Sequence, residues 1–284
     1  MSLNIKEIIA ATRDYNFHSH TQFCDGREPM EAMAAAAVAE GLTHYGFTPH
    51  SPICVPSSCN MLASDVGAYY AEFLRLRDIY DGRINLYFSM EIDYLGDKWG
   101  ATHPFFENIP LDYKLSSVHF IPSPTTGEEV DVDGSPVRFA GLMSRCFDGD
   151  IRYVVDTFYS RTIEMISRGG FDIIGHFDKI GFNASSFSPG IEDEPWYQRH
   201  ISDVIDALAE SGVVVEVNTK AVLPPVGSSR EEAEAYQPRI FPSPSIVSRL
   251  VKAGLPIAVN SDAHYPSRIR AGRSYAFSVI DSCI

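Results

Sequence analysis

The stretch DYNFHSH, residues 14–20, joins a short β-prone segment to two histidines that are separated by one residue. Alternate side chains on an extended strand point to the same side, so His18 and His20 can reach one metal ion. The same spacing recurs near the end of the chain in Asp262-Ala263-His264. We therefore expect a sheet whose strand ends share one metal-binding face.

Short apolar runs alternate with longer segments of helical periodicity, which is typical of βαβ units and a parallel sheet. We predict strands at residues 14–17, 44–47, 84–90, 113–118, 172–175, 213–217 and 256–259. We predict helices at residues 29–40, 65–80, 151–168, 197–211 and 245–253, each followed within two residues by a glycine that suits a C-cap. No linker or repeat divides the chain, so residues 1–284 are predicted to form a single α/β barrel domain.

Three connecting stretches are too long for simple turns. They span residues 120–150, 183–196 and 219–244 and are rich in Pro, Gly and Ser. Loops of this size in a barrel usually cover the active site, so we expect them to lie over the metal-binding face.

The composition excludes several classes of protein. With 284 residues, of which 45% are hydrophobic and 21% charged, the chain is globular in type rather than disordered. No apolar run approaches the ~20 residues of a membrane-spanning helix, and residues 1–15 lack the features of a secretory signal, so we expect a cytoplasmic protein. The net charge of −14 disfavours nucleic acid and anionic membranes as partners. The 5 cysteines are scattered without a C-x-x-C pair, which argues against a disulfide framework.

Metal-binding side chains stand at or near the ends of the predicted strands. The set consists of His18, His20, Asp25, His50, Glu91, His119, His176, Asp262 and His264. In an α/β barrel, side chains at the carboxyl ends of the strands converge on one face. Imidazoles and carboxylates without a sulfur pair suit Zn, Fe or Mn, and a bridging carboxylate such as Glu91 would hold two ions close together. The set is larger than one ion can use, so we expect two or three ions.

The order of these residues resembles that of the polymerase and histidinol phosphatase (PHP) superfamily. The shared series is an HxH pair, an Asp seven residues after the first His, a later His, then Glu, His, His and a terminal D-x-H, here from residue 18 to residue 264. The resemblance implies a distorted (β/α)7 TIM-like barrel with three divalent metal ions, Zn, Fe and/or Mn. It assigns His18, His20, Glu91 and Asp262 to the first ion, Glu91, His119 and His176 to the second, and Asp25, His50 and His264 to the third.

Three shorter segments resemble the monofunctional histidinol-phosphate phosphatases within this superfamily: MEIDY at residues 90–94, SVHF at 117–120, and YSR at 159–161. The resemblance implies hydrolysis of L-histidinol phosphate to L-histidinol and phosphate, a step of histidine biosynthesis. It also implies that Asp93 lies near the amine or imidazole of the substrate and that Arg161 contacts the phosphate. The expected partner is a small phosphorylated substrate, with no nucleic acid and no membrane, and we expect a monomer or homodimer.

The expected mechanism uses three of the ligand residues directly. Two ions that share Glu91 would also share a hydroxide, because coordination lowers the pKa of water toward ~7, and this hydroxide would attack phosphorus. Asp262, relayed by His20, is the candidate general acid for the leaving oxygen.

Several residue roles have a plainer alternative. Asp93 suits an orienting partner of a ligand histidine as well as a substrate contact. Arg161, on an amphipathic helix, suits a surface residue with a buried stem. Glu216 is either an orienting residue or a substrate contact, and Asp178 and Lys179 suit an ion pair within a loop.

Other functions remain open on the sequence. One is a PHP phosphoesterase that acts on a nucleotide or another small phosphate ester, and another is a non-catalytic metal-binding domain. An amidohydrolase is a third, although the lysine that such barrels carry at a mid-barrel strand end is not evident, and Glu91 takes that place.

Overall fold

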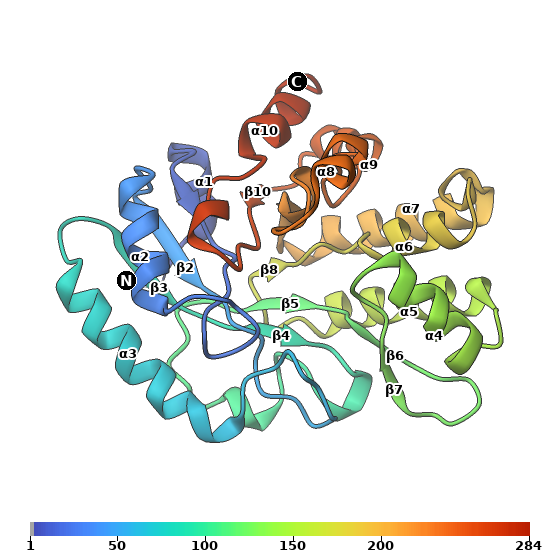
Figure 1. The fold of residues 1–284 in the computed structure, drawn as a ribbon, viewed down its shortest axis with the longest axis horizontal. Helices are drawn as coiled ribbons and strands as arrows, with labels where there is room; N and C mark the ends of the chain where they lie inside the picture. The colour runs from blue at the N-terminus through green and yellow to red at the C-terminus, as the bar shows by residue number, and fades with distance from the viewer. Residues whose placement is uncertain (1–2) are drawn as a thin grey trace.

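The strands lie toward the middle of the molecule with helices around them (Figure 1), in a computed structural model that describes residues 3–284. The strands are β1 Tyr15–Asn16, β2 His44–Phe47, β3 Asn85–Phe88, β4 Glu91–Asp93, β5 Leu115–Ser117, β6 Phe120–Pro122, β7 Glu129–Asp131, β8 Ile173–Ile174, β9 Val214–Asn218 and β10 Ile257–Asn260. The helices are α1 Ile5–Ala11, α2 Met30–Ala39, α3 Val66–Ile79, α4 Pro136–Cys146, α5 Ile151–Arg168, α6 Ile180–Phe187, α7 Pro195–Ser211, α8 Arg230–Ala235, α9 Pro244–Lys252 and α10 Arg273–Asp281.

The parallel strands form a distorted (β/α)7 barrel. One sheet has the order β1-β2-β3 and the other the order β10-β9-β8-β5-β4, and every pair in both is parallel. The two sheets meet at Ser89 and Met90, where β3 and β4 are consecutive parts of one strand. Each predicted strand therefore has an observed counterpart within residues 3–284, and the predicted barrel is confirmed.

Side chains close the barrel between β1 and β10. The Val259 amide donates to the Tyr15 hydroxyl at 3.1 Å, and the Phe17 amide donates to Asn260 Oδ1 at 2.8 Å. The Ser261 amide donates to Asn16 Oδ1 at 3.1 Å. Because side-chain oxygens replace backbone carbonyls as acceptors at this seam, the strands separate while their amides remain bonded. This seam is one source of the distortion.

An apolar layer fills the barrel interior on the amino side of the strand ends. It consists of Tyr15, Phe17, Tyr113, Leu115, Ile173, Val214 and Ala258, together with Ile5 of α1. Strand β9 shows why the layer stops, since its inward side chains change from Val214 to Glu216 and Asn218 along the strand. The interior is therefore apolar at one end and polar at the end where the sequence placed the metal ligands.

The three long connecting stretches contain more regular structure than the sequence analysis assigned to them. The first holds the antiparallel hairpin β6–β7 and helix α4, the second most of α6, and the third α8. Ser135 caps α4, and Ser229 forms a capping box with Glu232 at α8. These capping residues are the sequence signals for the missed helices. Helices α1 and α10 were also not predicted.

None of the helices in the described residues combines the length and apolar composition needed to cross a membrane.

Gly46 on β2 leaves room for Tyr113 in the barrel interior. A Cβ at position 46 would overlap the Tyr113 hydroxyl, which donates to the Phe17 carbonyl at 2.6 Å and cannot move without losing that bond. We expect Gly46→Ala to lower the free energy of unfolding by about 1–3 kcal/mol, as overpacking does. Urea denaturation measures this change.

Gly67→Ala in helix α3 is the matched control, because a Cβ there would meet no atom within 4 Å. Alanine suits a helix better than glycine, so we expect no loss and a gain of up to about 1 kcal/mol. Equal stability of Gly46→Ala and wild type would contradict the packing described for the barrel interior.

Candidate metal centre

All nine residues predicted as metal ligands come together at the carboxyl end of the barrel. Each belongs to at least one group of three or four residues whose ligand atoms lie within 4.8 Å of one another. The groups are His20-Asp25-His50-His264, His18-Glu91-His176, His18-His20-Asp262 and His50-Asp93-His119. The strand ends thus meet as expected. One group also contains Asp93, which was not predicted as a ligand.

Glu91 lies between two sets of imidazoles. Its Oε2 atom is 3.2 Å from His18 Nε2 and 3.1 Å from His50 Nδ1. Its Oε1 atom is 3.1 Å from His176 Nε2 and 3.5 Å from His119 Nε2. Each carboxylate oxygen therefore faces its own group of nitrogen atoms, which is the arrangement that a bridging ligand requires.

The remaining ligands gather around two aspartates. His20 Nε2 lies 3.0 Å from Asp262 Oδ1. Asp25 Oδ1 lies 3.3 Å from His264 Nε2 and 3.9 Å from His50 Nε2. The Asp25 group contains the residues that the resemblance assigned to a third ion.

The donor set fits divalent cations. His18 Nε2 and His20 Nε2 face each other at 3.2 Å, and His119 Nε2 and His176 Nε2 do so at 3.4 Å. Asp25 Oδ1 is buried without a hydrogen-bond partner. Buried carboxylates and opposed imidazole nitrogens are costly by themselves and favourable as ligands of a shared cation.

The charges within the cluster influence one another strongly. Burial would raise the pKa of Glu91, but the surrounding imidazoles, His18 first among them, hold the pKa well below its usual range. Burial lowers the pKa of His18, yet the facing Glu216 and Glu91 carboxylates raise it well above its usual value. Burial and the neighbouring His264 hold the pKa of His20 well below its usual value. The Glu91 carboxylate is therefore ionised, as a metal ligand must be.

Glu216 on β9 orients two of the ligand histidines. Its Oε1 atom lies 2.8 Å from His18 Nδ1 and accepts a hydrogen bond from Asn260 Nδ2 at 3.0 Å. Its Oε2 atom accepts from the His176 amide at 3.0 Å and from Asn218 Nδ2 at 3.1 Å. Both carboxylate oxygens therefore bond to groups that hold the ligand histidines in place. This arrangement fits the role of an orienting residue rather than that of a substrate contact.

Asp93 occupies a similar place behind His119. Its Oδ1 atom lies 2.7 Å from His119 Nδ1, and its Oδ2 atom accepts from Asn60 Nδ2 at 2.8 Å. The residue is 1% exposed and does not line the cavity described below. This placement fits the alternative of an orienting partner and does not bring Asp93 to a substrate.

A cavity of about 820 Å³ opens above the cluster. The ligands Asp25, His50, His119, Asp262 and His264 line it, and so do the aromatic residues Phe120, Phe182, Tyr236, Phe241 and Tyr265. Segments from all three long connecting stretches contribute to its wall, as the sequence analysis expected. A wall that combines aromatic side chains with charged groups of both signs suits a small polar ligand.

Arg161 does not reach this cavity. Its guanidinium donates to the Glu129 carboxylate at 2.6 Å and 3.0 Å and to the Phe120 carbonyl at 2.8 Å. The contacts fasten the β6–β7 hairpin to helix α5. The structure therefore places Arg161 in the packing of the hairpin and does not bring it to the ligands.

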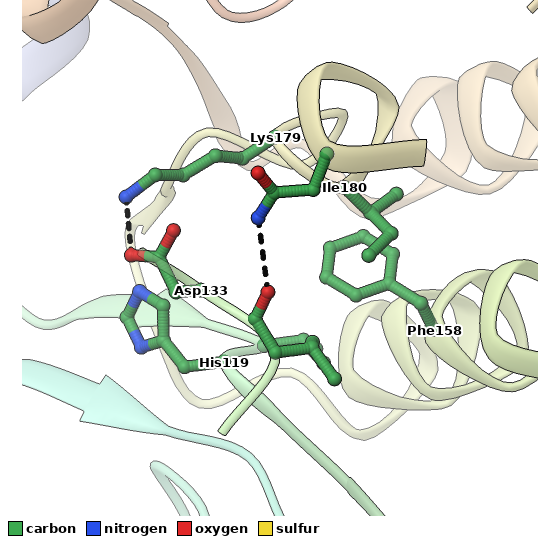
Figure 2. Close-up of a pocket in the computed structure, with 8 residues that line it drawn as sticks. His119, Asp133, Phe158, Lys179 and Ile180 are labelled. Atoms are coloured by element: carbon green, nitrogen blue, oxygen red, sulfur yellow. Dashed lines mark hydrogen bonds and ion pairs between the residues drawn. The ribbon is translucent and has the colours of Figure 1, made fainter. Parts of the chain in front are cut away.

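Cations other than Arg161 line the cavity. Lys179 Nζ lies 2.5 Å from Asp133 Oδ2, next to His119 (Figure 2). The predicted pairing of Lys179 with Asp178 is wrong, because Lys179 pairs with Asp133 and Asp178 accepts from the Ser243 amide at 2.8 Å. Lys220 also lines the cavity, and the sequence analysis did not identify it. Its only signal was its position three residues beyond the end of a predicted strand.

Comparison with known proteins agrees with this geometry. The model of the PHP domain matches residues 16–220. The chain belongs to the PHP family. This PHP chain is 28% identical over 264 residues to a protein of Deinococcus radiodurans named probable histidinol-phosphatase, with 89% of this chain and 86% of the relative covered. It is 22% identical over 263 residues to the histidinol-phosphatase of Bacillus subtilis, with 87% and 92% covered.

Solved structures share the fold of this PHP chain. A candidate histidinol phosphatase from Listeria monocytogenes superposes with a TM-score of 0.76 at 18% identity and covers 93% of this chain and 99% of its own. The histidinol phosphate phosphatase of Lactococcus lactis, in complex with zinc, L-histidinol and phosphate, superposes with a TM-score of 0.69 at 17% identity. That match covers 95% of this chain and 94% of the Lactococcus protein. PHP family members bind divalent metals, and the cluster described above offers imidazole and carboxylate donor atoms that suit such ions.

Glu216 should control metal affinity without being a ligand. We expect Glu216→Gln to weaken metal binding by about 10- to 100-fold, because the orientation of His18 and His176 depends on its carboxylate. Metal titration followed by mass-spectrometric metal analysis measures this effect. Glu210→Gln, at an exposed position on helix α7, is the control and should bind metal as wild type does. Wild-type affinity in Glu216→Gln would show that the histidines are held by other contacts.

Arg161 should matter for stability rather than for the substrate. Arg161→Met leaves the 2% exposed Glu129 side chain without its main partner, so we expect the free energy of unfolding to fall by about 1–3 kcal/mol at pH 7. Arg199→Met, at an exposed position on helix α7, should change it by less than about 0.5 kcal/mol. Urea denaturation at equal metal content measures both.

The effect of Arg161→Met should also depend on pH. Burial would raise the pKa of Glu129, but the Arg161 guanidinium holds it below its usual value. A carboxylate whose pKa is lower in the folded state stabilises the protein above its unfolded pKa of about 4.3, and this contribution is lost as pH falls further. The difference between wild type and Arg161→Met should therefore be complete at pH 7 and shrink below about pH 4. Unchanged stability together with weaker phosphate binding would restore the role implied by the resemblance.

Proposed function

We propose that this chain is a metal-dependent phosphomonoesterase whose substrate is L-histidinol phosphate. The observation that carries the proposal is the position of Glu91, whose two oxygens face separate imidazole groups. One imidazole of each group, that of His50 and that of His119, lines the cavity. A bridging carboxylate of this kind serves hydrolysis, because two ions held close together act on one phosphate. A purely structural metal site would instead be closed to substrate.

We propose three ions, held by the three sets of residues that the family resemblance implies. His18, His20, Glu91 and Asp262 would hold the first ion, Glu91, His119 and His176 the second, and Asp25, His50 and His264 the third. His18, His20 and Asp262 lie together, and so do Asp25, His50 and His264. His119 and His176 both approach Glu91 Oε1, at 3.5 Å and 3.1 Å. These close approaches support the grouping. Zinc is one candidate, because the Lactococcus lactis protein binds zinc, and Fe and Mn suit the same ligands.

The choice of substrate rests on the relatives. Both curated relatives are named for histidinol-phosphatase activity, and each match covers at least 86% of the two chains. The Lactococcus lactis structure contains L-histidinol together with phosphate. A cavity of about 820 Å³ has room for a ligand of that size in this chain.

Bound metal ions and side chains of the chain would have separate roles in the reaction. Bound divalent ions lower the pKa of coordinated water and neutralise the charge of a phosphate. Asp262 Oδ1 and His20 Nε2 lie 3.0 Å apart beside the cavity, so we propose that they carry the proton to the leaving oxygen. Glu216 and Asp93 keep the ligand histidines in place, and the aromatic wall excludes water. The cytoplasmic location and the state of monomer or homodimer remain predictions.

Phosphate release by protein reconstituted with Zn or Mn tests the proposal. We expect L-histidinol phosphate to be hydrolysed with a kcat/KM at least about 100-fold above the values for AMP and 4-nitrophenyl phosphate. A chelator should remove the activity and added metal should restore it, whereas Glu91→Ala should stay inactive at any metal concentration because the bridging ligand is lost.

Two outcomes would contradict this function. Higher kcat/KM for AMP would keep the metal centre and move the substrate to nucleotides. No release from any of the three esters by metal-loaded protein would favour the non-catalytic metal-binding domain.

A further inference from the structure

Lys220 is held at the edge of the metal centre by a rigid backbone. It lies two residues beyond the end of strand β9, and its amide donates to Asn218 Oδ1 at 2.9 Å. The buried hydroxyl of Thr219, one residue before, bonds to the carbonyls of Asn260 and Ala271 at 3.3 Å and 2.6 Å. The Lys220 side chain lines the cavity and is 38% exposed. Its base is therefore fixed while its ammonium group can reach both the ligands and the cavity.

The ammonium group of Lys220 contacts two proposed metal ligands. Nζ lies 3.2 Å from Asp262 Oδ1 and 3.3 Å from His264 Nε2. An ammonium group only donates hydrogen bonds, so it needs acceptors such as these. The same oxygen and nitrogen lone pairs are the ones that metal ions would use.

Metal binding would therefore weaken both contacts of the Lys220 ammonium. A lone pair that binds a divalent cation no longer accepts a hydrogen bond, and neighbouring positive charges repel the ammonium. Asp133, another carboxylate at the cavity, is already bound by Lys179 at 2.5 Å. An anion in the cavity would then replace these two acceptors as the charged partner of Lys220.

Besides Arg27, which lies at an exposed position, three other cations line the cavity, and these three differ in this respect. Lys179 is paired with Asp133, Arg138 with Asp131 at 3.0 Å, and Arg268 donates to the Pro224 carbonyl at 2.9 Å. None of these partners is a proposed metal ligand. Metal binding changes the contacts of Lys220 and leaves the contacts of these three in place.

We propose that Lys220 binds the phosphate group of the substrate and is released for this role when metal ions occupy Asp262 and His264. The inference rests on the proposed phosphomonoesterase function and adds a residue that determines its substrate affinity. It also explains why Arg161 can be committed to Glu129, because a different cation serves the phosphate.

Binding of inorganic phosphate to metal-loaded protein, measured by isothermal titration calorimetry, tests the role. We expect Lys220→Met to weaken phosphate binding by about 10- to 100-fold, because a hydrogen bond between two charged groups is lost. Lys220→Arg should keep most of the affinity. In metal-free protein the variants and wild type should bind phosphate equally weakly. Lys252→Met, which removes the same charge from an exposed position on helix α9, should match wild type.

Kinetics and metal analysis separate this role from a structural one. The KM for the phosphate ester should rise in Lys220→Met with a smaller change in kcat, as expected when a binding contact is removed. The metal content should stay at the wild-type value or above it, because a competing cation has been removed from Asp262 and His264.

Wild-type phosphate affinity in metal-loaded Lys220→Met would overturn the proposal. So would a loss of phosphate binding that follows a loss of metal, because Lys220 would then act by holding the ligands. Both results are distinguishable from failure of the proposed function. If wild-type protein binds phosphate through Lys220 but does not hydrolyse L-histidinol phosphate, the substrate is wrong and the role of Lys220 stands.

Discussion

The buried carboxylate of Glu91 is the constraint on which the rest of the structure depends. It is 1% exposed, and burial of an ionised carboxylate is stable only when positive charge or hydrogen-bond donors surround it. Imidazoles from several strands approach both of its oxygens, and the Ser117 hydroxyl donates to Oε1 at 2.7 Å. The barrel brings these groups together because parallel strands end on the same face. Metal ions complete the compensation that the side chains begin.

The contacts that close the barrel also hold the metal ligands. Asn260 Oδ1 accepts a hydrogen bond from the Phe17 amide, and Asn260 Nδ2 donates a hydrogen bond to Glu216. Glu216 in turn contacts His18, the residue that follows Phe17. A change in the seam between β1 and β10 would therefore move a ligand. This coupling explains why a polar network, rather than apolar packing, fills the carboxyl end of the barrel.

The electrostatic properties of the site differ from those of the whole chain. The net charge is −14, yet lysines and arginines line the cavity beside the metal ligands. Carboxylates on the β6–β7 hairpin and the turn after it hold several of these cations in place, as Asp133 holds Lys179. The acidic residues of this connection thus position positive charge at the cavity.

The sequence by itself predicted the strands, the set of side chains that gathers at their ends, and the family. Periodic apolar segments and alternating histidines are local patterns, and their spacing is fixed by the geometry of an extended strand. The partners of Arg161 and Lys220 could not be predicted from such local patterns. Each has the same local appearance as many other charged residues, so only the tertiary structure decided that Arg161 is bound by Glu129 and that Lys220 reaches Asp262. The physical reason is that a long, flexible side chain takes its partner from residues far away in the sequence, here 32 and 42 positions distant, and no local pattern records that distance.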